Sequence, residues 1–197
     1  MHDTQVRIAL RQELESRLLK RGNTVIFEEF AVKHGQARID LAVIGESIHG
    51  YEIKGDMDSL KRLPGQARIY STIFDRVTLV VGYRHAYKAL QIVPVWWGVK
   101  LVQMDARGKI RFNAARLPSN NPWQDKISIL RLLWKVEAIE FLNEIDGAVN
   151  YRNKSRNLIY ERIAQMADIE TIKTRVKQEI MKRTDWKSGV QRMLNGG

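Results

Sequence analysis

Apolar and polar residues recur at helical or strand-like spacing from residue 4 to residue 112, and the order of these segments predicts a mixed α/β domain. We expect a helix over 4–20, strands over 24–32, 37–44 and 51–54, a helix over 56–74 and a strand over 77–81. Pro64 lies inside the second helix and should break it near Leu63. The pattern is an α-β-β-β-α-β order whose first three strands form a meander.

A second group of segments follows this core. We expect a helix over 84–92, strands over 95–104 and 109–112, and helices over 125–146, 153–166 and 169–181. Residues 119–123 are rich in Ser, Asn and Pro, which is typical of a linker. The chain is therefore predicted to contain a core over 1–115, a linker over 116–124 and a basic, all-helical C-terminal region over 125–197.

Composition narrows the class of protein. Apolar residues make up 44% of the chain, enough for a packed core, and the sequence has no cysteine. Disulfides, thiol catalysis and zinc-thiolate sites are excluded, so a bound metal would be held mainly by oxygen. No long apolar stretch or signal sequence is found, and we expect a cytoplasmic protein with no membrane partner.

The formal net charge of +11 indicates a polyanionic partner, because Lys and Arg bind phosphate backbones with release of counterions. The excess is largest in residues 150–197, where 11 basic residues face 5 acidic ones. The candidate nucleic-acid-binding residues are Arg152, Lys154 and Arg156 in a turn between two helices, and Lys182 and Arg183 further on. This turn is equally compatible with a solvated loop. Our hypothesis is that the C-terminal region holds DNA.

Candidate chemistry lies in the second and third strands. Residues two apart in a strand point the same way, so Glu52 and Lys54 share one face, and an antiparallel pairing would place Asp40 close to Glu52. Two neighbouring carboxylates repel each other unless a cation such as Mg²⁺ or Mn²⁺ lies between them. Such a cation activates water for attack on phosphorus, and lysine can orient that water or stabilise charge. The alternative is an ordinary exposed hairpin in which these three charged residues have no catalytic role.

Asp40, Glu52 and Lys54 resemble the metal site of the PD-(D/E)XK nucleases, which often have a further carboxylate upstream, and three residues are candidates for it. Glu29 is preferred because it lies in the first strand, shortly before Asp40. Glu28 would face the opposite side of that strand, and Glu13 is an alternative in the first helix. Strand parity does not distinguish them. Both alternatives also fit solvated surface charges.

The predicted second helix adds Gln66 and Tyr70, which are four residues apart and share one helical face. A surface glutamine and a partly buried tyrosine without a functional role would show the same spacing. Their order after Glu52-Ile53-Lys54 resembles the fourth motif of the RecB-like branch of the PD-(D/E)XK nucleases. With Asp40 and the α-β-β-β-α-β order, these residues make the chain similar to that superfamily.

A narrower resemblance is to a small bacterial and phage family of the superfamily. It rests on segments spread over most of the chain: 50–54, 58–66, 94–98, 132–134 and 183–186. One departure is Ile39, which stands where the superfamily motif has proline.

The resemblance implies a restriction-endonuclease-like core with a mixed sheet and divalent-metal nuclease chemistry. DNA is the expected substrate, and a homodimer is possible because cutting a duplex requires two sites. The alternatives are a catalytically inactive nucleic-acid-binding subunit of a larger complex and an RNA-directed nuclease.

Two further groups of residues are assigned to structure rather than chemistry. His34, His49 and His85 lie near predicted loops and are expected on the surface. Trp96 and Trp97 precede an apolar strand and are expected to pack in the core, although aromatic pairs also stack on bases.

Overall fold

The computed structural model describes residues 3–18, 24–147 and 151–194, and the side chains up to Arg183. It confirms the α/β class, with a six-stranded mixed sheet and seven α-helices in the described part of the chain. Backbone contacts divide the chain into two compact units, Met1–Gln124 and Asp125–Gly197, which are described separately below. No helix in the described residues is both long and apolar enough to cross a membrane.

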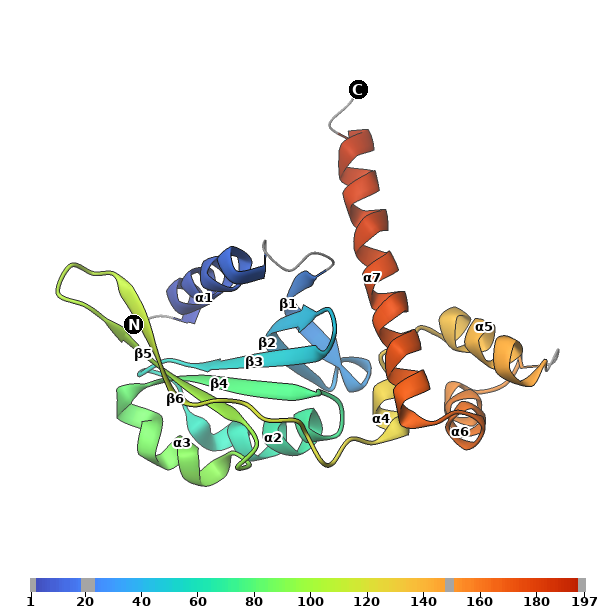
Figure 1. Cartoon of the computed structure of the whole chain (residues 1–197), viewed down its shortest axis with the longest axis horizontal. Coiled ribbons are helices and arrows are strands. Elements are labelled where there is room, and N and C mark those ends of the chain that lie inside the picture. Colours follow the sequence, from blue (N-terminus) through green and yellow to red (C-terminus); the bar gives the residue numbers. More distant parts are fainter. Residues whose placement is uncertain (1–2, 19–23, 148–150, 195–197) are drawn as a thin grey trace. The chain divides into compact units, whose positions relative to one another are not determined.

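The sheet of the first unit follows chain order from β1 to β6 (Figure 1). Strands β1, β2 and β3 pair antiparallel, which confirms the expected meander. Strand β4 pairs parallel with both β3 and β5, and β6 returns antiparallel to β5. The strands are β1 (Val25–Val32), β2 (Ala37–Ile44), β3 (Ile48–Lys54), β4 (Arg76–Gly82), β5 (Gly98–Met104) and β6 (Ile110–Arg116).

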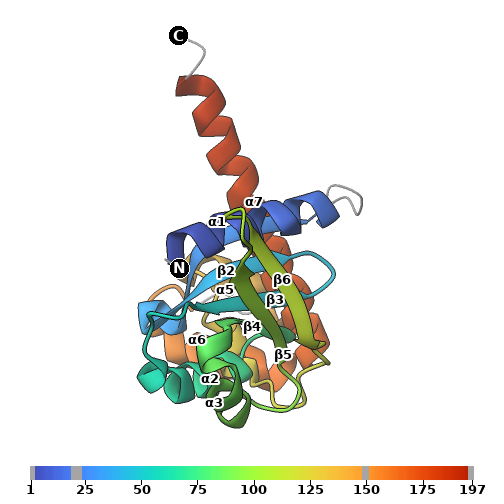
Figure 2. The same cartoon turned by 90° about the vertical axis from the view of Figure 1, so that its left-hand side faces the viewer.

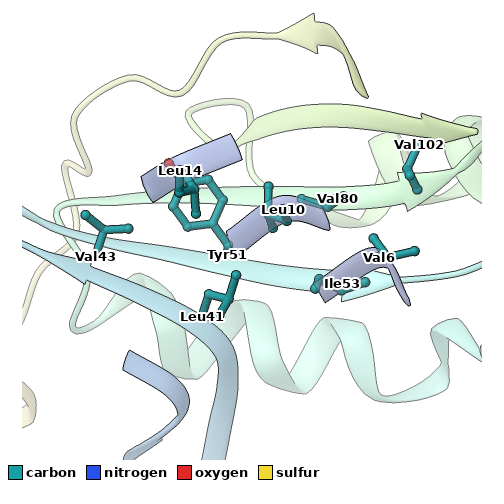
Figure 3. Packing of buried hydrophobic residues seen from close by; sticks show 9 residues of the cluster. All are labelled: Val6, Leu10, Leu14, Leu41, Val43, Tyr51, Ile53, Val80 and Val102. Carbon is teal, nitrogen blue, oxygen red and sulfur yellow. The ribbon is translucent and has the colours of Figure 1, made fainter. Parts of the chain in front are cut away.

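Helices cover both faces of this sheet. Helix α1 (Asp3–Leu18) lies on one face, and α2 (Leu63–Ser71) and α3 (Ala86–Ile92) lie on the other (Figures 1 and 2). Val6, Leu10 and Leu14 of α1 lie four residues apart and are buried, and Leu18 is partly buried. Figure 3 shows the three buried residues packed against the sheet, in a cluster made of Val6, Leu10, Leu14, Leu41, Val43, Tyr51, Ile53, Val80 and Val102.

The second helix is shorter than expected. A 3₁₀ turn, Leu60–Arg62, precedes α2, and Ser59 Oγ accepts a hydrogen bond from its Lys61 amide at 3.2 Å. Helix α2 begins at Leu63, so Pro64 lies in its first turn rather than in its interior. Proline is tolerated there because the first amides of a helix have no partner within it.

Residues following β6 return to the end of α2. Asn121 Nδ2 donates to the carbonyls of Ser71 (2.7 Å) and Phe74 (2.8 Å), and Gln124 Nε2 donates to that of Ile73 (2.9 Å). The carbonyls at a helix C-terminus have no partner within the helix. Asn121 and Gln124, in the segment expected to be a linker, therefore satisfy backbone groups of the first unit.

The described residues of the second unit form four helices, and the expected single helix over 125–146 is wrong. It is divided into α4 (Lys126–Leu130) and α5 (Lys135–Asp146). Asp125 caps α4 by accepting from the Ser128 amide (2.7 Å), and Glu137 accepts from the Trp134 amide (2.7 Å) at the start of α5. The other helices are α6 (Arg156–Met166) and α7 (Ile169–Leu194).

Candidate active site

Strand β3 carries Glu52 and Lys54 into the interior of the first unit. Their exposed fractions are 2% and 6%, and Lys54 Nζ lies 2.5 Å from Glu52 Oε1. Ile53, between them, belongs to the apolar cluster under α1. Strand alternation thus places a carboxylate and an ammonium together on the face opposite α1, where each charge has a partner.

Helix α2 supplies two more partners to Glu52. Gln66 Nε2 donates to Oε1 at 2.6 Å, and the Tyr70 hydroxyl lies 3.0 Å from Oε2 and 2.8 Å from the Arg38 carbonyl. Burial, followed by the charge of Glu52, raises the pKa of Tyr70, so its hydroxyl stays protonated and donates. The Trp97 ring stacks on Tyr70 at a centroid distance of 6.2 Å. The predicted helical pair therefore fixes the orientation of the carboxylate.

Asp40 lies where β2 and β3 stop pairing. The ladder between the strands ends at Leu41 and Tyr51, and Asp40 Oδ2 accepts from the Ile53 amide at 2.6 Å. Burial raises the pKa of Asp40 to about 6, and the charge of Glu52 is the second cause. The two carboxylates are therefore close enough to repel each other, as their strand positions predict.

Glu29 does not join them. Its carboxylate pairs with Arg7 and with Arg38, whose Nε lies 2.8 Å from Glu29 Oε2, and its backbone has a positive φ of 51°. Among the described residues, no group of three or more Asp, Glu, His or Cys side chains is arranged to hold a metal ion. The expected group of three carboxylates is absent from that part of the chain because two arginines take up the preferred third acid.

The two alternatives for the third acid are also engaged in ion pairs. Glu28 pairs with Arg11, and Glu13 Oε1 lies 2.7 Å from Lys100 Nζ. These contacts hold α1 to β1 and to β5. Both glutamates therefore have a structural role in this arrangement.

Sequence reasoning missed three residues beside the site. Arg7 Nη2 lies 3.6 Å from Asp40 Oδ1. Burial, followed by a hydrogen bond with Asp58 and its charge, raises the pKa of Asp3 to about 6. Asp58 Oδ2 accepts from the Gly55 amide at 2.6 Å. Asp3 and Arg7 are one helical turn apart in α1, and this spacing was the signal available in the sequence.

Asp40 and Glu52 can bind a divalent cation only through oxygen lone pairs that no hydrogen-bond donor already uses. Among the described residues, Glu52 Oε1 accepts from two donors, whereas Glu52 Oε2 and Asp40 Oδ2 each accept from one. Each carboxylate oxygen has two lone pairs. Mg²⁺ commonly uses one or two carboxylates and keeps several waters. Asp40 and Glu52 therefore fit a hard cation completed by water.

The expected nucleic-acid-binding residues fall into two groups. Arg152, Lys154 and Arg156 are exposed in and next to the turn before α6. Lys182 Nζ lies 2.9 Å from Glu179 Oε1. Arg183 was expected to be free to bind phosphate. Its guanidinium instead binds the Glu137 carboxylate and the Leu132 carbonyl, and it stacks on the Trp134 ring.

Arg183 of α7 contacts residues in and next to the break between α4 and α5. Its Nε donates to Glu137 Oε1 at 2.8 Å, its Nη2 donates to the Leu132 carbonyl at 3.0 Å, and its guanidinium carbon lies 4.3 Å from the Trp134 ring centroid. These contacts tie α7 to the start of α5. Arg183 is therefore a structural residue of the second unit rather than an exposed phosphate-binding residue.

His49 is also placed differently from expectation, since its side chain is partly buried in the first unit. Its ring stacks on Tyr51 at 4.3 Å, and its Nε2 lies 2.9 Å from Thr78 Oγ1. Burial, followed by the positive charges of Arg76 and Lys100, lowers the pKa of His49 to about 3. It is therefore a neutral packing residue.

The two tryptophans are buried as expected. The exposed fractions of Trp96 and Trp97 are 4% and 0%. Their rings meet edge to face at a centroid distance of 6.1 Å. Stacking on nucleic-acid bases is excluded for both in this conformation.

Two solved structures resemble parts of the chain. SPO1766, a protein of unknown function from Silicibacter pomeroyi, is 18% identical with a TM-score of 0.44, covering 77% of this chain and 100% of its own. SfsA of Pyrococcus furiosus in complex with Ca²⁺ is 15% identical with a TM-score of 0.37, covering 59% of this chain and 65% of its own.

Sequence comparison gives a clearer relationship. Protein cII of Enterobacteria phage P4 is 28% identical over 183 residues, which are 93% of this chain and 68% of that protein. The family model for bacteriophage P4 protein cII matches residues 1–193. The chain therefore belongs to the bacteriophage P4 protein cII family.

Proposed function

We propose that this chain is a divalent-metal-dependent nuclease of the PD-(D/E)XK kind that hydrolyses phosphodiester bonds in DNA. The observation that carries the proposal is the buried pair of Glu52 and Lys54 beside Asp40, with Nζ 2.5 Å from Oε1. Burying charged groups costs free energy, and a site that only needed stability would be at least as stable with apolar side chains. Charged groups held on a packed sheet are typical of a site that performs chemistry.

Each residue has a defined part in this proposal. Asp40 and Glu52 would hold Mg²⁺ or Mn²⁺, which supplies the positive charge that acidifies water and offsets charge on phosphate oxygens. Lys54 donates hydrogen bonds toward the reacting group and stabilises negative charge there. Gln66 and Tyr70 hold the Glu52 carboxylate in one orientation.

Charge supports a nucleic-acid substrate. The net charge of +11 favours binding to a phosphate backbone, and the exposed Arg152, Lys154 and Arg156 add to it in the second unit. DNA is proposed because the sequence contains no RNA-specific aromatic pair of the RRM type.

The test is cleavage of labelled single-stranded, duplex and branched DNA, and of RNA, with Mg²⁺ or Mn²⁺. We expect cleavage of DNA that is lost in Asp40→Asn and in Lys54→Ala. Asp105→Asn is the matched control, because Asp105 is a partly exposed acid of the β5–β6 turn paired with Arg111. A folded wild-type protein that cuts no DNA contradicts the proposal, and cleavage of RNA alone changes its substrate.

A second candidate is a nucleic-acid-binding subunit without turnover. It is favoured by the absence, in the described residues, of a group of three or more ligands and by the two donors that already occupy Glu52 Oε1. Calorimetric titration with Mn²⁺ separates the two candidates. Binding that disappears in Asp40→Asn supports the nuclease, and equal heats in both proteins support the subunit.

A further inference from the structure

Arg7 is placed beside the acidic pair by the packing of α1. Its neighbour Val6 is fully buried in the cluster between α1 and the sheet, together with Leu10 one turn later. Arg7 Nη2 lies 3.6 Å from Asp40 Oδ1, while Nη1 pairs with Glu29. A helix that contributes no proposed metal ligand thus brings a positive charge to one of them.

The guanidinium of Arg7 is only partly used in these contacts. Its Nε is buried and, within the described residues, has no hydrogen-bond partner. Its contact with Asp40 is longer than a hydrogen bond, and the Glu29 that it binds is shared with Arg38. The planar guanidinium offers five donors in a fork that matches phosphate oxygens. Arg7 therefore retains donor capacity next to the proposed site.

On the basis of the proposed function, we propose that Arg7 is a phosphate-binding residue that rests on Asp40 until a divalent cation takes that carboxylate. A cation on Asp40 repels a guanidinium a few ångströms away. Glu29 holds the other end of the side chain, so Arg7 stays at the site when it leaves Asp40. Its fork is then available to the phosphodiester backbone of the bound nucleic acid.

This role predicts opposite changes in two affinities. Removing the charge in Arg7→Gln should tighten Mn²⁺ binding about threefold, since a partly exposed charge is worth little more. It should weaken binding of a fluorescein-labelled DNA duplex in Ca²⁺ about tenfold, because a charge-assisted contact is lost. Arg7→Lys should keep the wild-type Mn²⁺ affinity and lose part of the DNA affinity, because lysine has no fork.

The experiment combines Mn²⁺ calorimetry with fluorescence anisotropy of the labelled duplex. Arg11→Gln is the matched control: Arg11 lies one turn further along α1 and pairs with Glu15 and Glu28. It should leave Mn²⁺ affinity unchanged and weaken DNA binding less than Arg7→Gln. Thermal melting establishes that each variant is folded.

Two results overturn the role of Arg7: an unchanged Mn²⁺ affinity in Arg7→Gln, or a DNA affinity equal to that of Arg11→Gln. Failure of the proposed function has a different signature. In that case the wild-type protein binds Mn²⁺ no more tightly than Asp40→Asn, whatever happens at Arg7.

Discussion

Lys54 Nζ lies 2.5 Å from Glu52 Oε1, and both side chains are almost completely buried. Lys54→Met keeps the volume of the side chain but leaves Glu52 without its counter-charge. Loss of one partner of a buried pair costs about 3–5 kcal/mol. We expect a decrease of this size in the free energy of unfolding, measured with urea.

The partner variants make this measurement specific. The double variant Glu52→Gln with Lys54→Met removes both charges and should recover most of the lost stability. Lys100→Met breaks the more exposed pair with Glu13 and should cost only about 1 kcal/mol. Equal losses in Lys54→Met and Lys100→Met would show that burial of the first pair has no energetic consequence.

The Tyr70→Phe variant distinguishes a role of Tyr70 in cation binding from a contribution to stability alone. It removes a buried hydroxyl that contacts Glu52 and the Arg38 carbonyl, and should cost about 1–2 kcal/mol. Tyr160→Phe removes a comparable hydroxyl that donates to the Leu133 carbonyl in the second unit. We expect similar losses in urea, but weaker Mn²⁺ binding only in Tyr70→Phe. A similar weakening in both variants would contradict a specific role for Tyr70.

The lowered pKa of His49 predicts that the free energy of unfolding depends on pH. Its pKa is lowered to about 3 in the folded protein from 6.5, so the unfolded chain binds the proton more readily between these values. Above pH 6.5, His49 is neutral in both states and does not lower the free energy of unfolding. Below pH 6.5, the free energy of unfolding falls by up to about 1.4 kcal/mol for each pH unit, because the unfolded chain binds the proton.

The comparison with His49→Gln isolates this contribution. Asp3 and Asp40 have raised pKa values of about 6, so their contributions rise as the pH falls through 6. The measured quantity is therefore the difference in unfolding free energy between wild type and His49→Gln, followed from pH 7 to pH 5. A difference that stays constant with pH would mean that His49 titrates normally in the folded protein.

The length of the first unit can be tested with two fragments. A fragment of residues 1–115 lacks Asn121 and Gln124, which bind the carbonyls of Ser71, Ile73 and Phe74. A fragment of residues 1–124 keeps them. We expect the shorter fragment to be less stable by about 2 kcal/mol or more in urea, because several buried acceptors lose their donors. Equal stability would contradict a structural role for the returning segment.

Local spacing predicted which side chains come together around Glu52 in the candidate site. Strand alternation predicted that Glu52 and Lys54 share a face, and helical spacing predicted that Gln66 and Tyr70 act from one side of α2. Both predictions depend only on neighbouring residues. The extended position of Asp40 beside β3 followed from the short connection between two strands.

Other features depend on contacts that spacing does not reveal. Glu29 has the right position in the chain, but Arg7 and Arg38 neutralise it from outside its strand. The apolar periodicity of residues 125–146 is continuous, and the break within it is stabilised partly by Arg183, far away in sequence. His49 looked like a loop residue because β3 begins earlier, at Ile48, than its pattern indicated.

The apolar side of α1 has a consequence for interpreting mutations. Val6, Leu10 and Leu14 pack between α1 and the sheet, and they determine where Asp3 and Arg7 stand relative to Asp40. A cavity made at Leu10 would therefore disturb the charges around Asp40 without touching any motif residue. The Mn²⁺ affinity that we propose for the acidic pair should therefore decrease when α1 packs less well against the sheet, although both carboxylates are unchanged.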